Sequence, residues 1–398
     1  MRLRPAAFVL LAACAGMPTS HYVPQGEGLP SSARRSYRKA LSAARHGDLA
    51  RARRILDGLC THHPLRLAFH LERLRVVKQA ESAEAAAHLY EPPPPGVDPE
   101  RARILASLAR LQDDRLQERR ELLQFAASYE AREALWLVGL SEVDLRIADR
   151  VAARGRLERD LGQVDRAAAS LAEALSIFAR VHKHLRAVLE LDSELAEAYL
   201  ALGILATRRA DLATSFDAAD DWRRRAEEHY RQALSLDPRS LPGRINLAEN
   251  LLYFEMYDDA IQELRLAADL APPQILVWRN LGLAYYKAGR LRDAEKSYRT
   301  ALSLQPHNAA IRVALADCLR RQQDADEASA ELLRAREDVG DDDALRAVIA
   351  FKLGALYEHT KQYKQAVEQY ERHIELGGEY TAKARSRVRT IYDYAFEE

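Results

Sequence analysis

The chain has 398 residues, with 59 basic and 59 acidic side chains, and therefore no formal net charge at neutral pH. This balance gives little support to nucleic acid as a partner, because binding to phosphate backbones relies on an excess of Lys and Arg. Charged residues make up 30% and aromatic residues 7%, and no strand pattern is evident, which favours exposed helices over a β-sheet.

The first fourteen residues change from basic to apolar and end at a cysteine. Arg2 and Arg4 precede an apolar run over residues 6–13, which is too short to cross a bilayer as a helix and suits the apolar region of a secretory signal. The run ends in "LAAC", which resembles the lipobox of bacterial lipoproteins. The resemblance implies that the signal peptide, residues 1–13, is removed and that Cys14 receives the lipid. An ordinary cleaved signal with an incidental cysteine is the alternative.

The residues after Cys14 bear on the membrane and on the distance from it. Ala15 follows the cysteine, where an aspartate retains enteric lipoproteins at the inner membrane, so the resemblance implies an outer-membrane anchor that faces the periplasm. Residues 14–31 contain several prolines and glycines and show no apolar period, which predicts a flexible tether. Its r.m.s. reach is roughly 20 to 25 Å.

Helical patterns fill the next part of the chain, with one break. Residues 32–91 are predicted to be helical, and Gly47, Ala52, Leu56 and Pro64 fit the second half of a repeat unit found later in the chain. Four consecutive prolines favour an extended linker over residues 92–98. Residues 99–195 carry apolar residues at helical intervals and are predicted to form antiparallel helices, derived from eroded repeats.

Residues 276–308 contain two amphipathic helical patterns, joined by a turn at Gly289 and closed by Pro306. Apolar and small residues fall at helical intervals on both sides of the turn, which predicts a helical hairpin. Proline cannot continue the second helix. These positions are Trp278, Leu281, Gly282 and Tyr285 before the turn and Ala294, Tyr298 and Ala301 after it.

The hairpin recurs along the chain at a fixed interval, since Pro306 steps back to Pro272 and then, by the same step, to Pro238. This period of about 34 residues and the signature residues resemble the tetratricopeptide repeat (TPR). The resemblance implies an all-α fold, an α-solenoid of stacked hairpins over residues 196–380, with residues 381–398 as a capping helix. An insertion of about eleven residues interrupts the first unit around residues 207–222, and about four extra residues precede the last unit.

Stacked hairpins present the first helix of each unit on a concave face, where TPR proteins bind peptides or partner proteins. The resemblance places six residues of two adjacent units on that face. Amide side chains at matching places there could hydrogen-bond an extended peptide, or the residues could simply be solvated positions of the first helices. The candidate partner-binding residues are Asn246, Glu249, Arg279, Asn280, Leu283 and Tyr286.

No catalytic, metal or cofactor site emerges from the sequence. His182 and His184 stand two apart and would point in different directions on a helix, and the acidic run 341–343 lacks the spacing of a calcium loop. That run is predicted to be a solvated turn that caps a helix. Cys60 and Cys318 are predicted to be small buried residues and not a disulfide. No phosphate-binding Gly loop and no nucleophile turn is present.

The sequence therefore predicts a protein-binding scaffold of a Gram-negative bacterium, held at the outer membrane by a lipid, with no small-molecule substrate and no enzymatic activity. Similar lipoproteins serve as assembly factors for secretins, type IV pili and gliding-motility complexes, and the resemblance implies a role of this kind. An accessory role in envelope polysaccharide or peptidoglycan synthesis is the first alternative. An enzyme is the second, and it is disfavoured because helical patterns fill nearly the whole chain and leave no region for a separate catalytic domain.

Overall fold

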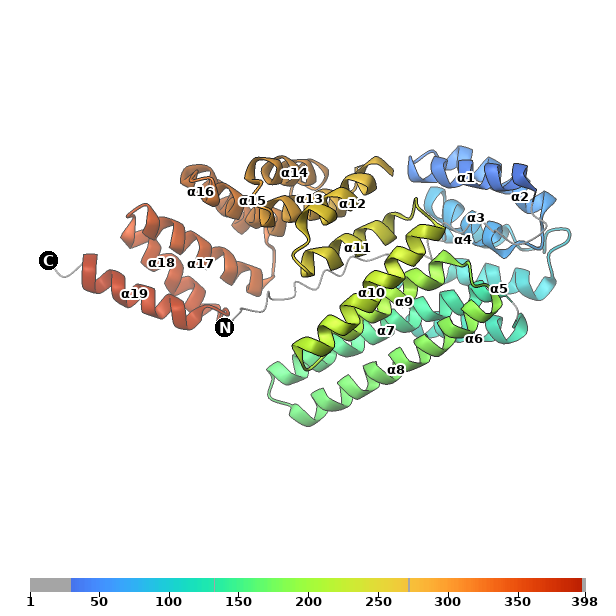
Figure 1. Cartoon of the computed structure of the whole chain (residues 1–398), viewed down its shortest axis with the longest axis horizontal. Coiled ribbons are helices and arrows are strands. Elements are labelled where there is room, and N and C mark those ends of the chain that lie inside the picture. The colour runs from blue at the N-terminus through green and yellow to red at the C-terminus, as the bar shows by residue number, and fades with distance from the viewer. Residues whose placement is uncertain (1–29, 132, 271–272, 396–398) are drawn as a thin grey trace. The chain divides into compact units, whose positions relative to one another are not determined.

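The computed structural model describes residues 30–131, 133–270 and 273–395 (Figure 1). Within these ranges the chain forms nineteen α-helices and no strand, so the predicted all-α fold of repeated helical hairpins is confirmed. The predicted signal, Cys14 and all but the last two residues of the tether lie outside the described residues. No described helix is both long enough and apolar enough to span a membrane.

The helices fall into two compact units, one ending at Asn250 and the other beginning at Leu251. The first unit contains α1 (Ser31–Arg45), α2 (Leu49–His62), α3 (Leu67–Ala80), α4 (Ala83–His88), α5 (Pro99–Arg110), α6 (Leu116–Tyr129), α7 (Ala134–Asp160), α8 (Val164–Leu191), α9 (Ala196–Asp211), α10 (Phe216–Leu236) and most of α11 (Leu241–Tyr253). The second contains α12 (Tyr257–Leu270), α13 (Ile275–Lys287), α14 (Leu291–Leu304), α15 (Ala309–Arg321), α16 (Ala325–Asp338), α17 (Asp343–His359), α18 (Tyr363–Glu375) and α19 (Thr381–Ala395).

Successive helices pack in pairs, because each amphipathic helix covers its apolar stripe against a neighbour. In the first unit α1 packs on α2, α7 on α8 and α9 on α10, and Figure 1 shows α7 to α10 as four long neighbouring helices. In the second unit α13 packs on α14, α15 on α16 and α17 on α18. The final helix, α19, packs on α18 and buries Ala384 and Ile391.

The turns inside the hairpins follow the repeat period. Glu255 (φ 60°), Gly289 (φ 77°) and Gln323 (φ 67°) adopt left-handed backbone conformations, and each stands one full period after the one before it. Lys361 (φ 61°) follows Gln323 by slightly more than one period. The extra residues lie in α17, which has 17 residues, whereas α13 and α15 have 13 each.

The insertion in the first repeat of the predicted array lengthens a hairpin and does not form a long loop. Helices α9 and α10 have 16 and 21 residues, against 13 and 14 in α13 and α14. Gly203 and Tyr230 are farther apart in the sequence than Gly282 and Tyr298 are, yet each tyrosine ring lies against its glycine. The extra residues lengthen α9 by about one helical turn and α10 by about two, and the longer hairpin keeps the same facing residues.

One hydrophobic core continues across the proline-rich segment 92–98. Its buried side chains extend from Leu67 in α3 to Leu205 in α9, and they include Tyr90 and Val97 on either side of the prolines. The hydroxyl of Tyr90 lies 2.9 Å from Nδ1 of the buried His70 in α3. The proline-rich segment therefore joins α4 to α5 within a single unit.

Candidate functional site

Four of the predicted partner-binding residues lie on α13 in the second unit. Asn280 is 2% exposed, and its Oδ1 accepts hydrogen bonds of 2.8 and 3.2 Å from the guanidinium group of Arg279. Leu283 is 38% exposed. Tyr286 is half-buried, with the guanidinium carbon of Arg321 4.7 Å from its ring centroid. Leu283 and Tyr286 therefore offer a partner more accessible surface than Asn280 does.

The other two predicted residues lie on α11, in its part that belongs to the first unit. Asn246 is half-buried and Glu249 is exposed. They are three residues apart, so their side chains are neighbours on the helix surface. The assignment of these residues to a partner-binding face stays a prediction.

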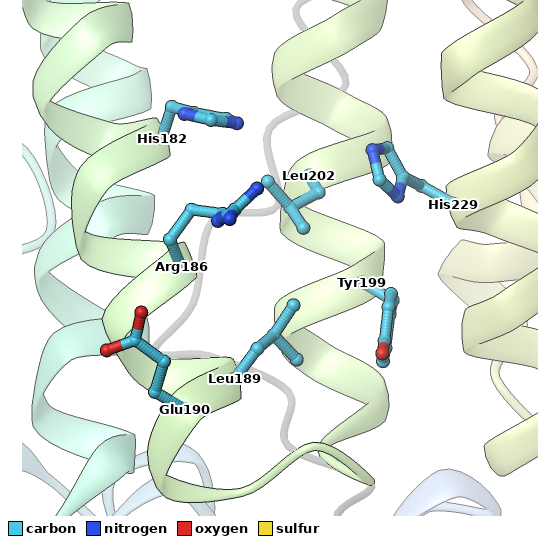
Figure 2. Close-up of a pocket in the computed structure, with 7 residues that line it drawn as sticks. All are labelled: His182, Arg186, Leu189, Glu190, Tyr199, Leu202 and His229. Carbon is cyan, nitrogen blue, oxygen red and sulfur yellow. The ribbon is translucent and has the colours of Figure 1, made fainter.

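A second candidate is a groove within the first unit, with α8 and α10 as its walls and α9 as its floor; we call it the α8–α10 groove (Figure 2). Its main part has a volume of about 430 Å³, and an adjoining part has about 230 Å³. The main part is lined by His182, Arg186, Leu189 and Glu190 of α8, Tyr199 and Leu202 of α9, and His229 of α10. The adjoining part shares His182, Leu202 and His229 and adds Leu205, Ala206, Arg209, Trp222 and Arg225.

A small side chain leaves room for the α8–α10 groove. Ala206 occupies the place in its hairpin that Tyr285 and Tyr357 occupy in two hairpins of the second unit. Because repeat interiors are close-packed, a methyl group in the place of a phenol ring leaves unfilled volume unless a neighbour moves in. Here the volume beside Leu202 and Ala206 remains open to solvent as part of the groove.

Two guanidinium groups lie close to one indole ring in the adjoining part of the groove. The guanidinium carbons of Arg209 and Arg225 are 4.6 and 4.7 Å from the ring centroid of Trp222, within cation–π range. Burial, and then the positive charge of Arg225, lowers the pKa of Arg209. Among the described residues, no carboxylate forms an ion pair with Arg209, Arg225 or Arg186, and Glu190 is the one acidic residue that lines the groove, so the groove carries a net positive charge.

His182 and His229 stand on opposite walls of the groove (Figure 2). Burial is the main cause that lowers the pKa of each imidazole. Arg186 and Arg209 lower the pKa of His182 further. For the pKa of His229, Glu228 opposes the shift, whereas His182 and Arg225 add to it. Both side chains are therefore mostly neutral at pH 7. No Ser, Thr or Cys is among the residues that line the groove, and no group of three His, Cys, Asp or Glu side chains in the described ranges could hold a metal ion. The lining suits reversible binding of an anion.

Four other residues singled out in the sequence lie outside both candidate sites. The carboxylate of Asp342 accepts a hydrogen bond from the backbone N–H of Leu345 (2.9 Å) and caps α17, which confirms the predicted capping turn. Cys60 and Cys318 are buried free thiols, as predicted. His184 lies outside the groove lining that His182 joins, which agrees with the prediction that the two imidazoles point in different directions.

The α8–α10 groove is absent from the sequence predictions. Two signals for it exist in the sequence: an alanine at a tyrosine place of the repeat, and the unusual grouping of Arg209, Trp222 and Arg225 around the insertion. The repeat register assigns partner-binding residues only to the first helices of the hairpins. Two of the three helices that form the groove, α8 and α10, are second helices.

Comparisons with known proteins match parts of the chain. Residues 285–350 match the family described as tetratricopeptide repeat. The chain is 32% identical over 88 residues to Protein STIP1 homolog of Dictyostelium discoideum, and 27% identical over 142 residues to Type IV pilus assembly protein PilF of Pseudomonas aeruginosa. These alignments cover 22% and 35% of this chain, and they span 16% and 52% of the length of the two relatives.

Several solved structures are also similar. They include YrrB, described as a TPR protein with an unusual peptide-binding site (19% identity, TM-score 0.38, 48% of this chain and 92% of that chain), Pseudomonas aeruginosa PilF (18%, 0.42, 62% and 96%) and the Cut9–Hcn1 hetero-tetramer of APC/C (17%, 0.45, 91% and 70%). The matched segment and the recurring hairpins agree on one conclusion. The chain carries tetratricopeptide repeats and is similar to PilF and to other TPR proteins.

Proposed function

We propose that this protein is a lipid-anchored scaffold that binds partner proteins during assembly of an envelope complex, such as a pilus, a secretin or a gliding-motility machine. The lipid is attached to Cys14, and the chain faces the periplasm from the outer membrane of a Gram-negative bacterium. The tether over residues 14–31 holds the helical repeats a short distance from the membrane surface.

The recurrence of TPR hairpins is the observation that carries the scaffold function. Each hairpin packs mainly on its neighbours, so a row of hairpins leaves the same helix face accessible in unit after unit. On α13 that face includes the exposed Leu283 and the half-buried Tyr286. An extended surface of this kind suits a protein partner, whereas a small molecule needs a concave site that covers most of its surface.

The similarity to PilF supports an assembly role. PilF of Pseudomonas aeruginosa is a type IV pilus assembly protein, and its alignment with this chain runs over 142 residues, longer than four repeat units. The chain spans about half the length of PilF. The assembly role of this chain therefore rests on a partial match together with the predicted lipid anchor.

The anchor has a direct physical test. Each buried methylene of an acyl chain contributes about 0.8 kcal/mol, so several chains hold a protein firmly at a membrane. In a Gram-negative host, the Cys14→Ala variant of the full chain should move from the outer-membrane fraction to the soluble periplasmic fraction. Cys60→Ala, which removes a buried thiol, should leave the fractionation unchanged. Sedimentation of the Cys14→Ala variant with the outer membrane would refute the anchor.

The scaffold function is tested by site-specific photocrosslinking in the full chain. A crosslinker at Leu283 or Tyr286 should capture an envelope assembly protein, whereas one at Leu304, a 42% exposed residue of the second helix α14, should not. Leu283→Asp should abolish capture from position 286, because it places a charge in an apolar contact. Capture of glycosyltransferases or peptidoglycan enzymes would indicate the alternative accessory role. Equal capture from position 304 would exclude the predicted face.

A further inference from the structure

We propose that the α8–α10 groove binds an acidic segment of a partner protein, with Arg186, Arg209 and Arg225 as the groups that receive its carboxylates. This inference rests on the proposed scaffold function and adds a second binding surface to it. The surface belongs to the first unit and uses two second helices, so it is distinct from the predicted residues of α13 in the second unit.

The groove arginines lack the acidic partners that neighbouring arginines have. Arg208 forms an ion pair with Asp149 (2.9 Å), whereas no described carboxylate pairs with the adjacent Arg209, nor with Arg225 or Arg186. Arg209 is half-buried and has therefore lost part of its hydration. A partly desolvated cation gains more from an anionic ligand than a fully solvated one does.

Trp222 holds two of these cations in position before a ligand binds. The guanidinium groups of Arg209 and Arg225 lie against its ring. A guanidinium group stacked on an aromatic ring still directs its N–H groups outward, where they can bind a carboxylate in a bidentate manner. Because the side chains are already held in place, less conformational entropy is lost when the ligand binds.

The floor of the groove is apolar. Leu202, Leu205 and Ala206 of α9 line it, and Leu189 of the α8 wall adds a further apolar side chain. A ligand that has carboxylates on one side and an aliphatic or aromatic side chain on the other can bind the arginines with the first and pack on the apolar floor with the second. The volumes of about 430 and 230 Å³ suit a few side chains of a peptide segment and exclude a folded domain.

The charge changes along the groove, which favours a protein ligand over nucleic acid or lipid. Glu190 is the one acidic residue among those that line it. It follows His182 by eight residues, about 12 Å along the axis of α8, and His182 borders the part that contains Arg209 and Arg225. A nucleic-acid strand with a phosphate at every nucleotide, or a uniformly anionic membrane, would be repelled by the Glu190 carboxylate. A peptide can place acids near Arg209 and a basic residue near Glu190.

The two groove histidines make this binding sensitive to pH. His182 faces Arg186 of α8, Arg209 of α9 and His229 of α10. His229 faces Glu228 and Arg225 of α10 and His182 of α8. Protonation adds positive charge to the groove, and a bound carboxylate favours the protonated form. Binding of an acidic segment should therefore strengthen as the pH falls below about 6.5.

The test uses the full chain with Cys14→Ala, which removes the lipid, and a fluorescein-labelled peptide of alternating Glu and Leu ending in Lys. Fluorescence anisotropy should show binding that weakens with added salt. Replacement of Glu by Gln in the peptide should abolish it. The double variant Arg209→Gln/Arg225→Gln should lose about tenfold in affinity, because two charge contacts are removed. The double variant Arg209→Lys/Arg225→Lys should retain most of the binding.

Matched controls separate this proposal from unfolding and from the scaffold function. Arg156→Gln/Arg159→Gln removes the same charge from exposed positions of α7 and should bind the peptide like the parent chain. Melting temperatures and circular dichroism of all variants confirm folding. Equal binding by Arg209→Gln/Arg225→Gln, or tighter binding to phosphatidylglycerol vesicles than to the peptide, would overturn the groove assignment. Crosslinking from Leu283 would be unaffected by that result, so the two proposals fail separately.

Discussion

The ring of Tyr298 occupies the space that a side chain at position 282 would need, since a Cβ atom on Gly282 would lie 2.5 Å from Cε1 of the ring. The next hairpin holds Ala316 and Leu332 at the corresponding places, and both are buried. A larger residue on the first helix is therefore matched by a smaller one on the second. The glycine in this repeat serves the fit of an aromatic ring between the helices.

This pairing predicts a specific rescue. Gly282→Ala should destabilise the protein by about 1 to 3 kcal/mol, because the Tyr298 ring must shift in a packed interior. The double variant Gly282→Ala/Tyr298→Leu copies the Ala316 and Leu332 pair and should recover much of that loss. Chemical denaturation of the two single variants and the double variant gives the coupling energy. Additive effects of the two substitutions would contradict the proposed fit.

The left-handed turn residues give a second prediction. Gln323 adopts φ 67° at the place that Gly289 occupies with φ 77° in the preceding hairpin. A non-glycine residue costs about 1 kcal/mol or more in this region, so Gln323→Gly should stabilise the second unit by about 0.5 to 1 kcal/mol after the entropy cost of glycine. Gly289→Gln should destabilise it by a similar amount. A Cβ on Gly289 would meet no atom within 4 Å, so only the backbone conformation is tested. Thermal unfolding of both variants should show shifts of opposite sign.

A third prediction concerns a buried carboxylate that joins three helices. Asp144 of α7 is 0% exposed and accepts hydrogen bonds from Arg120 of α6 (2.7 Å) and Arg180 of α8 (3.0 Å). Asp144→Ala should cost about 3 kcal/mol, because it leaves two cations without their partner. Asp149→Ala breaks the half-exposed pair with Arg208 and should cost less than about 1 kcal/mol. Equal losses in urea denaturation would argue against a special role for Asp144.

Local chemistry explains why the hairpins could be predicted from the sequence. Gly289 and Pro306 end helices by their backbone preferences, and the small and aromatic residues between them repeat at a fixed interval. The other turns carry no such local signal, because Glu255, Gln323 and Lys361 adopt the left-handed conformation without being glycine. They become visible only when the chain is aligned to its own period.

The candidate sites depend on packing that the sequence pattern does not contain. The repeat register places Asn280 on a first helix, yet its amide is buried and hydrogen-bonded to Arg279. The side-chain conformation that buries it depends on tertiary packing, which the repeat register does not specify. The insertion could have formed a loop, but it lengthens α9 by about one helical turn and α10 by about two relative to α13 and α14. The hollow beside Ala206 then exists only because neighbouring helices leave that volume unfilled.

His70 and Tyr90 connect the pH to the stability of the first unit. His70 is 0% exposed; its Nε2 lies 2.8 Å from the carbonyl oxygen of Pro64, to which it donates, and its Nδ1 lies 2.9 Å from the Tyr90 hydroxyl. This arrangement uses the neutral imidazole, with Tyr90 as the donor to Nδ1. Burial is the main cause that lowers the pKa of His70 to about 4, and Arg73 and Arg101 lower it further, while the bond to Pro64 opposes the shift.

The sign of the pH effect follows from this lowered pKa. Above about pH 6.5 the imidazole is neutral in both the folded and the unfolded chain, so its contribution to stability is fully present. As the pH falls, the unfolded chain binds a proton that the folded chain refuses, and stability is lost until the folded pKa near 4 is reached. The loss amounts to about 3 kcal/mol. His70→Gln should reduce stability at pH 7.5, because Gln fits these hydrogen bonds less well, and should remove this part of the pH dependence. Urea denaturation of both proteins between pH 7.5 and 4.5 measures the difference in slope. Parallel curves would show that the folded chain protonates His70 as readily as the unfolded chain does.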